Sequence, residues 1–268
     1  MNLIDGKLLR DKILASLKTE VEKKSLQPNL AIIIVGEDPS SLAYIKQKIK
    51  SVEQIGGRVQ LFQFPINVSE EEILKKIADL NKKGKVKGIV VQLPLPSQID
   101  AYKVTQAIDV TKDVDGLNEK SSFQPATPLA VMEILKEEKV KIEGKIVVVL
   151  GRSKLVGAPL KGMLEEKGAQ VIQIHSQTPK PIDSLVQQGD IVVSAVGKAH
   201  LVTAAMVKQG AAVIDVGISR DPETGKLVGD VDFENVKEKA LLITPVPGGV
   251  GPMTVAMLLK NLVTASRI

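Results

Sequence analysis

Short apolar runs alternate along this chain with longer stretches in which apolar and charged residues share helical spacing. The clearest runs are 30–35, 88–93 and 146–150, and β-branched residues are frequent in them. Continuous apolar runs of this length are typical of strands that are buried on both faces of a parallel sheet. The stretches between them predict amphipathic helices. The pattern therefore predicts an α/β protein.

The first part of the chain predicts an α/β domain of its own. Its expected elements, in chain order, are helix 8–24, strand 30–35, helix 40–55, strand 59–64, helix 69–82 and strand 88–93. Turn signals at Gly36-Glu-Asp-Pro39 and Gly56-Gly57 separate neighbouring elements. After the last strand, Pro94 and Pro96 favour an extended and rigid segment.

The second part of the chain repeats the alternation. Its expected elements are helix 127–139, strand 146–150, helix 158–167, strand 170–176, a helix from 182, strands 190–196 and 211–216, a hairpin over 217–232 around Pro222-Glu-Thr-Gly225, strand 241–245 and a closing helix 253–264. Residues 146–176 follow the order strand, glycine turn, helix, strand. This geometry offers backbone N–H groups and the positive end of a helix to a phosphate.

The glycine turn after strand 146–150 is the candidate cofactor site. Gly151 and Gly157 depart from the usual G-x-G-x-x-G spacing, so an ordinary strand-to-helix turn remains an alternative. The next strand ends at His175-Ser-Gln-Thr178 and offers no carboxylate to ribose hydroxyls, whereas Arg152 lies in the glycine turn. Because an Arg fork pairs with phosphate bidentately, this combination suits a 2′-phosphate and favours NADP over NAD.

Composition narrows the class of partner. The chain has 268 residues, enough for one large or two modest domains. Aromatic residues make up 2% and Trp is absent, so few side chains can stack on bases, which argues against nucleic-acid binding. A net charge of +5, with lysines spread along the chain, fits small anions better than a DNA duplex. With no Cys and two His, we expect no disulfide, no thiol chemistry and no metal site.

The N-terminal segment Met1-Asn-Leu-Ile-Asp-Gly-Lys7 lacks the pattern of a signal peptide. No apolar run approaches the length that spans a bilayer. We therefore expect a cytoplasmic protein with no membrane partner.

Three polar residues are candidates for chemistry at the carboxyl edge of the first sheet. Tyr44 and Lys48 lie four residues apart on a predicted helix and therefore share a face. Gln92 interrupts an apolar strand just before its end. Open α/β sheets bind ligands at this edge, but a solvated helix surface and a satisfied core amide remain simpler explanations. The Y-x-x-x-K spacing also marks short-chain dehydrogenases, which we reject because there it follows the glycine turn.

The segment Lys112-Asp-Val-Asp-Gly116 supplies two carboxylates. It lacks the third ligand and the spaced Glu of a calcium-binding loop. A plain Asx turn closed by glycine therefore stays open beside a role for Asp115 in a site.

Together these motifs resemble the bifunctional methylenetetrahydrofolate dehydrogenase/methenyltetrahydrofolate cyclohydrolase family over essentially the full chain. The matching segments are Val35-Gly36, 39–48, 91–96, 112–116, 151–153 with Val156-Gly157 and Pro159, 214–217 and 244–254. The most specific is the last, Thr244-Pro-Val-Pro-Gly-Gly-Val-Gly-Pro-Met-Thr254. The chain departs from the family at Ala126, often Cys, and at Gly197-Lys-Ala-His200, where Gly-Lys-Pro is more usual.

The resemblance implies oxidation of 5,10-methylenetetrahydrofolate with NADP, followed by hydrolysis of the methenyl product to 10-formyltetrahydrofolate. It implies that Lys48 is the catalytic cation or general acid/base and that Gln92 orients or tunes it. Tyr44 would pack on the pterin side, and Asp115 would hold the amino-nitrogen edge of the pterin. The other site residues that it implies are Pro247, Gly248 and Gly249 for substrate, and Gly151, Arg152, Ser153, Ser176, Ile218 and Thr254 for the cofactor.

The same resemblance implies two α/β domains with a cleft between them. One is a catalytic, folate-binding domain of residues 1–124 plus 253–268, and the other is a Rossmann-type NADP-binding domain of residues 125–252. It also implies a homodimer through the cofactor domain, for which the hairpin 217–232 offers an edge. Two rival functions are another NADP-dependent dehydrogenase and a non-catalytic nucleotide-binding regulator, which would bind NADP without reducing it.

Overall fold

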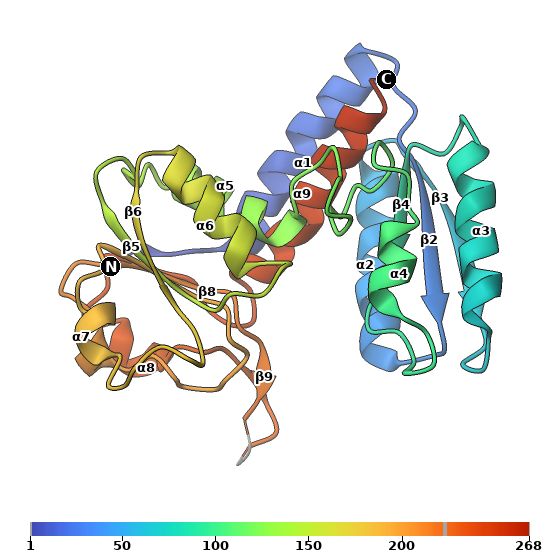
Figure 1. Cartoon of the computed structure of the whole chain (residues 1–268). Coiled ribbons are helices and arrows are strands. Elements are labelled where there is room, and N and C mark those ends of the chain that lie inside the picture. The colour runs from blue at the N-terminus through green and yellow to red at the C-terminus, as the bar shows by residue number, and fades with distance from the viewer. Residues whose placement is uncertain (1, 222–223, 268) are drawn as a thin grey trace. The chain divides into compact units, whose positions relative to one another are not determined.

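The computed structural model describes residues 2–221 and 224–267 (Figure 1). The chain divides into two compact units, each with its own parallel sheet. The small-sheet unit comprises Asp11–Ala126 and Val255–Ile268. The large-sheet unit comprises Met1–Arg10 and Thr127–Thr254. Helices α1 (Gly6–Lys23) and α9 (Val250–Ala265) continue from one unit into the other.

The small-sheet unit is built on three parallel strands in the order β3-β2-β4. Strand β2 (Asn29–Val35) lies between β3 (Arg58–Phe64) and β4 (Gly88–Val91). Its residues Ala31, Ile33 and Val35 pack with apolar residues of α3 (Glu70–Lys82) and α4 (Ala101–Gln106). Helix α2 (Pro39–Gln54) lies on the opposite side of the sheet from α3 (Figure 1). A central strand covered on both faces explains why β2 is an unbroken apolar run.

Local caps fix where the helices of this unit begin. Asp38 accepts a hydrogen bond from the N–H of Ser41 at 2.7 Å, and Pro39 occupies the first turn of α2. Ser69 accepts from the N–H of Glu72 at 3.2 Å, and three glutamates lie in the first turn of α3. Both arrangements satisfy backbone donors that a helix leaves free at its start. The start of α2 is thus set directly after the carboxyl end of β2.

The large-sheet unit holds six parallel strands in the order β1-β11-β8-β7-β5-β6. These strands are β1 (Asn2–Leu3), β5 (Ile146–Leu150), β6 (Gln170–Ile174), β7 (Ile191–Ser194), β8 (Ala212–Asp215) and β11 (Leu242–Ile243). Val148, Val192, Val213 and Ile243 from four of them share one buried core. Strand β5 pairs with β6 on one side and β7 on the other, so the strand order reverses at β5.

Short elements connect these strands. The helices are α5 (Ala126–Glu137), α6 (Gly157–Glu166), α7 (Asp183–Val186) and α8 (Phe233–Val236), with a 3₁₀ turn at Ala204–Met206. Strands β9 (Ser219–Arg220) and β10 (Leu227–Val228) form an antiparallel hairpin, which projects from the unit in Figure 1. Its predicted turn residues Pro222 and Glu223 lie outside the described residues. None of the described helices combines the length and apolar character needed to cross a membrane.

The structure differs from the predicted elements in several places. The helix expected from 182 is a single turn, Asp183–Val186. The strand expected over 88–93 ends at Val91, before the two prolines. Helix α4, helix α8 and strand β1 were not predicted. We expected residues 1–10 in the folate-binding domain. They belong to the large-sheet unit instead, because β1 pairs with β11.

Candidate functional site

The small-sheet unit brings Lys48, Gln92 and Tyr44 together. Lys48 lies on α2 and is only 6% exposed, and its Nζ donates to Gln92 Oε1 at 3.1 Å. The Nζ atom lies 5.9 Å from the centroid of the Tyr44 ring, one helical turn earlier. Gln92 Nε2 donates to Leu93 O at 2.8 Å, which fixes the amide so that its oxygen faces the ammonium. Gln92 follows β4 directly, so the cluster lies where that strand ends.

Asp115 belongs to the same unit but stands in the loop that follows α4. In the described part of the chain its side chain makes no hydrogen bond with Lys48 or Gln92. Neighbouring groups hold its loop: Asn261 Nδ2 donates to Val114 O at 2.9 Å, and the N–H of Asn118 donates to Asp113 Oδ2 at 2.7 Å. The Asp115 side chain itself is half-buried. The loop that carries it is held by hydrogen bonds on both sides of Asp115.

Asp113 is the buried member of that carboxylate pair. It is fully buried, and its Oδ1 has no hydrogen-bond partner among the described residues. Burial raises the pKa of Asp113 to about 6, against the opposing hydrogen bond from Asn118. Asp113 therefore supports the loop from the interior. Of the two carboxylates, Asp115 is the one that a ligand can reach.

In the large-sheet unit, the turn after β5 has the geometry of a phosphate-binding turn. Gly151 has a φ of 114°, and a Cβ atom there would lie 2.6 Å from Ala195 O. A Cβ atom at Gly157 would lie 2.2 Å from Gly151 O. Helix α6 then begins at Gly157 without a side-chain cap. The N–H of Ala158 donates to Ser153 O at 3.0 Å and Pro159 has no N–H, so the N–H of Gly157 is the donor at this helix start with no recorded acceptor among the described residues. That N–H, beside the bare glycine backbone at the positive end of α6, suits an anionic phosphate.

A pocket of about 490 Å³ lies beside this turn. Its lining comes from the segments after β5, β6 and β7, and includes the predicted residues Gly151, Arg152, Ser153 and Ser176. The pocket is thus at the carboxyl ends of the strands where the strand order reverses, which is the usual ligand position in open α/β sheets. Arg152 Nη2 donates to Gln177 Oε1 at 2.9 Å, so the guanidinium points to the end of β6.

Five predicted residues of this unit lie outside the pocket lining. Ile218 follows β8 and is 53% exposed. Thr254 Oγ1 donates to Gly251 O at 2.8 Å in the first turns of α9. Pro247, Gly248 and Gly249 form the turn before α9, where Gly248 has a φ of 115° and Gly249 packs against Pro245 O. Their roles stay predictions.

Sequence reasoning missed two buried carboxylates in this unit, Asp215 and Asp230. Burial raises the pKa of Asp215 to about 7, although the N–H groups of Val231 and Asp230 oppose the shift. One feature of the sequence could have pointed to Asp215: it is a single charged residue directly after the apolar residues 212–214. Among the described residues, no group of His, Cys, Asp and Glu could hold a metal ion.

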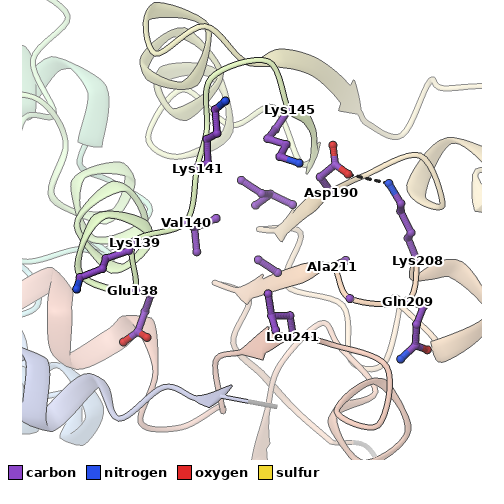
Figure 2. A pocket seen from close by; sticks show the side chains of 13 residues that line it. Glu138, Lys139, Val140, Lys141, Lys145, Asp190, Lys208, Gln209, Ala211 and Leu241 are labelled. Atoms are coloured by element: carbon purple, nitrogen blue, oxygen red, sulfur yellow. Dashed lines mark hydrogen bonds and ion pairs between the residues drawn. The ribbon is translucent and has the colours of Figure 1, made fainter.

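A second pocket, of about 310 Å³, opens at the amino ends of β5, β7, β8 and β11 (Figure 2). Lys139, Lys141, Lys145 and Lys208 line it, together with Asp190. Figure 2 shows the ion pair in which Lys208 Nζ meets Asp190 Oδ1 at 2.7 Å. No predicted site residue lies here.

Comparison with protein families decides between the possible functions of this fold. A model described as the tetrahydrofolate dehydrogenase/cyclohydrolase catalytic domain matches residues 4–115, and one described as the NAD(P)-binding domain matches residues 125–268. The chain belongs to the tetrahydrofolate dehydrogenase/cyclohydrolase family. The two-domain α/β fold predicted from the sequence is confirmed, with a catalytic amino-terminal and an NAD(P)-binding carboxyl-terminal domain.

Individual family members match over their whole length. The bifunctional protein FolD of Nautilia profundicola is 45% identical over 279 residues, covering 100% of this chain and 98% of its own. The crystal structure of the bifunctional FolD enzyme from Campylobacter jejuni has a TM-score of 0.94 at 42% identity and covers 100% and 99%. The Trypanosoma brucei enzyme, solved in complex with NADP cofactor and an inhibitor, has a TM-score of 0.92 at 40% identity and covers 99% and 97%.

Proposed function

We propose that this chain oxidises 5,10-methylenetetrahydrofolate to 5,10-methenyltetrahydrofolate with NADP and hydrolyses the product to 10-formyltetrahydrofolate. Both domain models of the family match, and full-length relatives are named as bifunctional enzymes. The observation that carries the assignment of residues is the hydrogen bond between the buried Lys48 and Gln92. A lysine is almost never buried unless it is paired with a carboxylate, whereas among the described residues this one has the neutral amide of Gln92 and the ring of Tyr44 beside it, as a group reserved for chemistry would.

The large-sheet unit fits the cofactor. The bare backbone at Gly151 and the N–H of Gly157 at the start of α6 suit the pyrophosphate, and Arg152 lies beside the end of β6, where a ribose 2′-phosphate would bind. When bound, NADP supplies the acceptor for the hydride of the one-carbon bridge. The contribution of the protein to this step is alignment, because the cation that remains is stabilised by its two flanking nitrogens.

The hydrolytic step requires proton transfers, and Lys48 is the residue placed to perform them. Water adds to the carbon of the methenyl bridge and loses a proton, which gives a hydroxyl on that carbon. One C–N bond then breaks as its nitrogen gains a proton, and the hydroxyl releases its own proton to the solvent to become the formyl oxygen. Lys48 Nζ acts as the base for the first transfer as an unprotonated amine, and the ammonium that this forms is the acid that protonates the nitrogen. Gln92 Oε1 fixes the position of Nζ, while Leu93 O fixes the amide of Gln92.

The folate is held by groups around that ammonium. The Tyr44 ring, 5.9 Å from Lys48 Nζ, packs on the pterin side. Asp115 accepts hydrogen bonds from the amino-nitrogen edge of the pterin, which a carboxylate does well because it offers two acceptor oxygens. Pro247, Gly248 and Gly249 contribute to substrate binding, and Ile218 and Thr254 to cofactor binding. In this proposal the small-sheet unit is the folate-binding domain.

The enzyme works as a homodimer that pairs through the large-sheet unit. The β9–β10 hairpin supports this, since two short exposed strands with Leu227 46% exposed offer an edge that a second chain can cover. Sedimentation that shows a monomer at micromolar concentration would argue against the dimer.

A cytoplasmic location stays a prediction, which cell fractionation tests.

One assay on a single preparation tests the proposed function. The reduction of NADP by methylenetetrahydrofolate and the hydrolysis of methenyltetrahydrofolate are followed spectrophotometrically, with NAD compared in parallel. We expect both activities, with NADP preferred. Binding of NADP without reduction would favour the regulator, and reduction without hydrolysis would remove Lys48 from its assigned role.

A further inference from the structure

Two buried aspartates of the large-sheet unit form a network that reaches the cofactor pocket. Asp230 follows the hairpin and is 0% exposed, and Asp215 closes β8 and is 3% exposed. No described lysine or arginine pairs with either carboxylate, and the recorded donors are backbone N–H groups and one hydroxyl. A buried carboxylate is costly unless such donors surround it, so both positions need a structural or functional reason.

Asp230 holds the loop that follows β7. Its Oδ2 accepts from the N–H of Val196 at 2.7 Å and from Ser194 Oγ at 2.8 Å. Its Oδ1 accepts from the N–H of Lys198 at 2.7 Å. Val196 and Lys198 line the pocket beside the glycine turn. One carboxylate therefore sets the direction of two alternate peptide groups in one wall of that pocket.

Backbone pairing does not replace these bonds. The segment 229–232 pairs with the loop only from His200 onward, where the N–H of His200 meets Gly229 O at 3.3 Å and the N–H of Val202 meets Asp230 O at 2.9 Å. Ala195 is held by Leu150 O at 2.8 Å. Between these two anchors, the carboxylate of Asp230 is the recorded acceptor for the amides of Val196 and Lys198.

Asp215 in turn holds the segment that carries Asp230. Its Oδ1 accepts from the N–H of Asp230 at 3.0 Å and its Oδ2 from the N–H of Val231 at 2.9 Å. Glycines make room for both carboxylates. A Cβ atom at Gly229 would lie 1.9 Å from Asp215 Oδ2, and one at Gly217 would lie 2.0 Å from Asp230 Oδ1.

We propose that Asp230 is a positioning residue for cofactor binding, which fixes the pocket wall at Val196 and Lys198, and that Asp215 keeps Asp230 in place. The inference rests on the proposed cofactor site. A carboxylate suits this task because both of its oxygens accept, so it orders two N–H groups at once. An Asn at this position presents one acceptor and one donor, and the donor faces an N–H group. The loop then loses one of its two restraints.

The test compares Asp230→Asn with a matched control, Asp190→Asn. Asp190 belongs to the same unit, accepts from the N–H of Ile146 at 3.1 Å, and lies at the opposite end of the strands (Figure 2). For Asp230→Asn we expect the KM for NADP to rise by roughly tenfold or more, the loss expected from one charge-assisted hydrogen bond. The KM for folate and the cyclohydrolase kcat, which needs no cofactor, report intact folding. Asp190→Asn should leave the KM for NADP unchanged.

The outcomes separate this inference from the proposed function. An inactive wild-type protein contradicts the proposed function, whereas an active wild type with equal KM for NADP in both variants overturns the role of Asp230. If Asp230→Asn does not fold, amide hydrogen exchange on the cofactor-free wild type decides. The amides of Val196 and Lys198 should exchange slowly despite lying in an exposed loop, and exchange at open-loop rates would refute the proposal.

Discussion

The two sheets of this protein reverse their strand order in the same way but use the resulting edge differently. In the small sheet the reversal occurs at β2, and in the large sheet at β5. At the small-sheet edge the proposed chemistry belongs to side chains on regular elements, since Lys48 on α2 meets Gln92 directly after β4. At the large-sheet edge the pocket is walled by the loops that follow β5, β6 and β7.

This difference shows what each task requires. A reacting ammonium needs one helix and one strand end to place it, and a single hydrogen bond between them fixes its position. A dinucleotide is long and contacts main chain, so its site needs loops of defined conformation. Those loops depend on the glycine backbone at Gly151 and on buried acceptors such as Asp230. Substitutions at the first edge should therefore change turnover, and those at the second should change cofactor affinity.

The largest effect is expected at Lys48. Lys48→Met keeps much of the bulk of the stem but removes the proton-transferring group, so cyclohydrolase kcat should fall by roughly 10²–10⁴-fold. Part of the dehydrogenase activity should survive, because hydride transfer asks for orientation more than for an acid. Gln92→Ala should show the same asymmetry more weakly, since Gln92 acts on Lys48. Steady-state assays of both reactions on each variant measure the split.

Lys46→Met is the matched control for this experiment, because Lys46 is exposed on the same helix. It should leave both activities unchanged. Full cyclohydrolase turnover in a folded Lys48→Met variant would remove Lys48 from the chemistry and leave the small-sheet edge without its reacting group.

A pH-dependent effect is expected from Asp113, which supports the loop of Asp115. Its pKa is about 6 in the folded chain against 3.8 for the free side chain, so the folded state holds the proton more tightly. The free energy of unfolding should therefore fall as the pH rises from about 4 to 6, by at most about 3 kcal/mol in total. Asp113→Asn removes this component, and urea titrations at several pH values measure it.

Asp109 provides the opposite control on the same loop. The hydroxyl and N–H of Thr111 donate to the carboxylate of Asp109 and lower its pKa, so the charged form stabilises the folded state. Asp109→Asn should therefore lower the free energy of unfolding above pH 4. If the wild type and Asp113→Asn lose stability in parallel between pH 4 and 6, Asp113 is not the group that titrates there.

The sequence predicted the long elements because their signals are local. The run 30–35 and the signals of Asp38-Pro39 and Ser69 lie within the elements that they specify, and β2, α2 and α3 formed within one residue of the expected bounds. Strand β1 escaped prediction because two residues carry no periodicity, and its pairing with β11 joins positions about 240 apart in the chain. Helix α4 is short and follows a proline-rich segment that reads as a loop.

The residues of the candidate sites also differ in whether a local sequence signal marks them. Tyr44 and Lys48 were readable from helical spacing, and Gln92 from its place in an apolar strand. Asp230 was not readable, since its partners at Val196 and Lys198 are more than thirty residues away and are backbone N–H groups that leave no trace in the side-chain pattern. The meeting of side chains at the small-sheet edge could thus be expected from the sequence, whereas at the large-sheet edge the sequence pointed only to the glycine turn and to Ser176 at the end of the next strand.

Arg152 tests whether the large-sheet edge distinguishes the two cofactors. Arg152→Ala should weaken NADP binding by roughly 1.5–3 kcal/mol, the scale of a charge-assisted contact, and should hardly affect NAD. Direct titration with each cofactor measures the difference. Gln177→Ala, which removes the present partner of the guanidinium, serves as control and should have little effect on either. Equal losses for NADP and NAD would place Arg152 on the pyrophosphate instead.

The smallest effect is expected at the amino ends of the large-sheet strands, where Lys208 pairs with Asp190 at 2.7 Å. The lysine side chain is 51% exposed, so solvent screens the pair, and Lys208→Ala should lower the free energy of unfolding by less than about 1 kcal/mol. The loss should shrink further at high salt, because exposed ion pairs are screened. The pKa of Asp190, now held low chiefly by Lys208, should rise in the variant.

The KM for NADP should not change in Lys208→Ala, since this pocket is at the far end of the strands from Gly151. A KM that rises as much as in Arg152→Ala would mean that the two ends of the sheet are coupled, and the assignment of cofactor binding to the carboxyl edge alone would have to be abandoned.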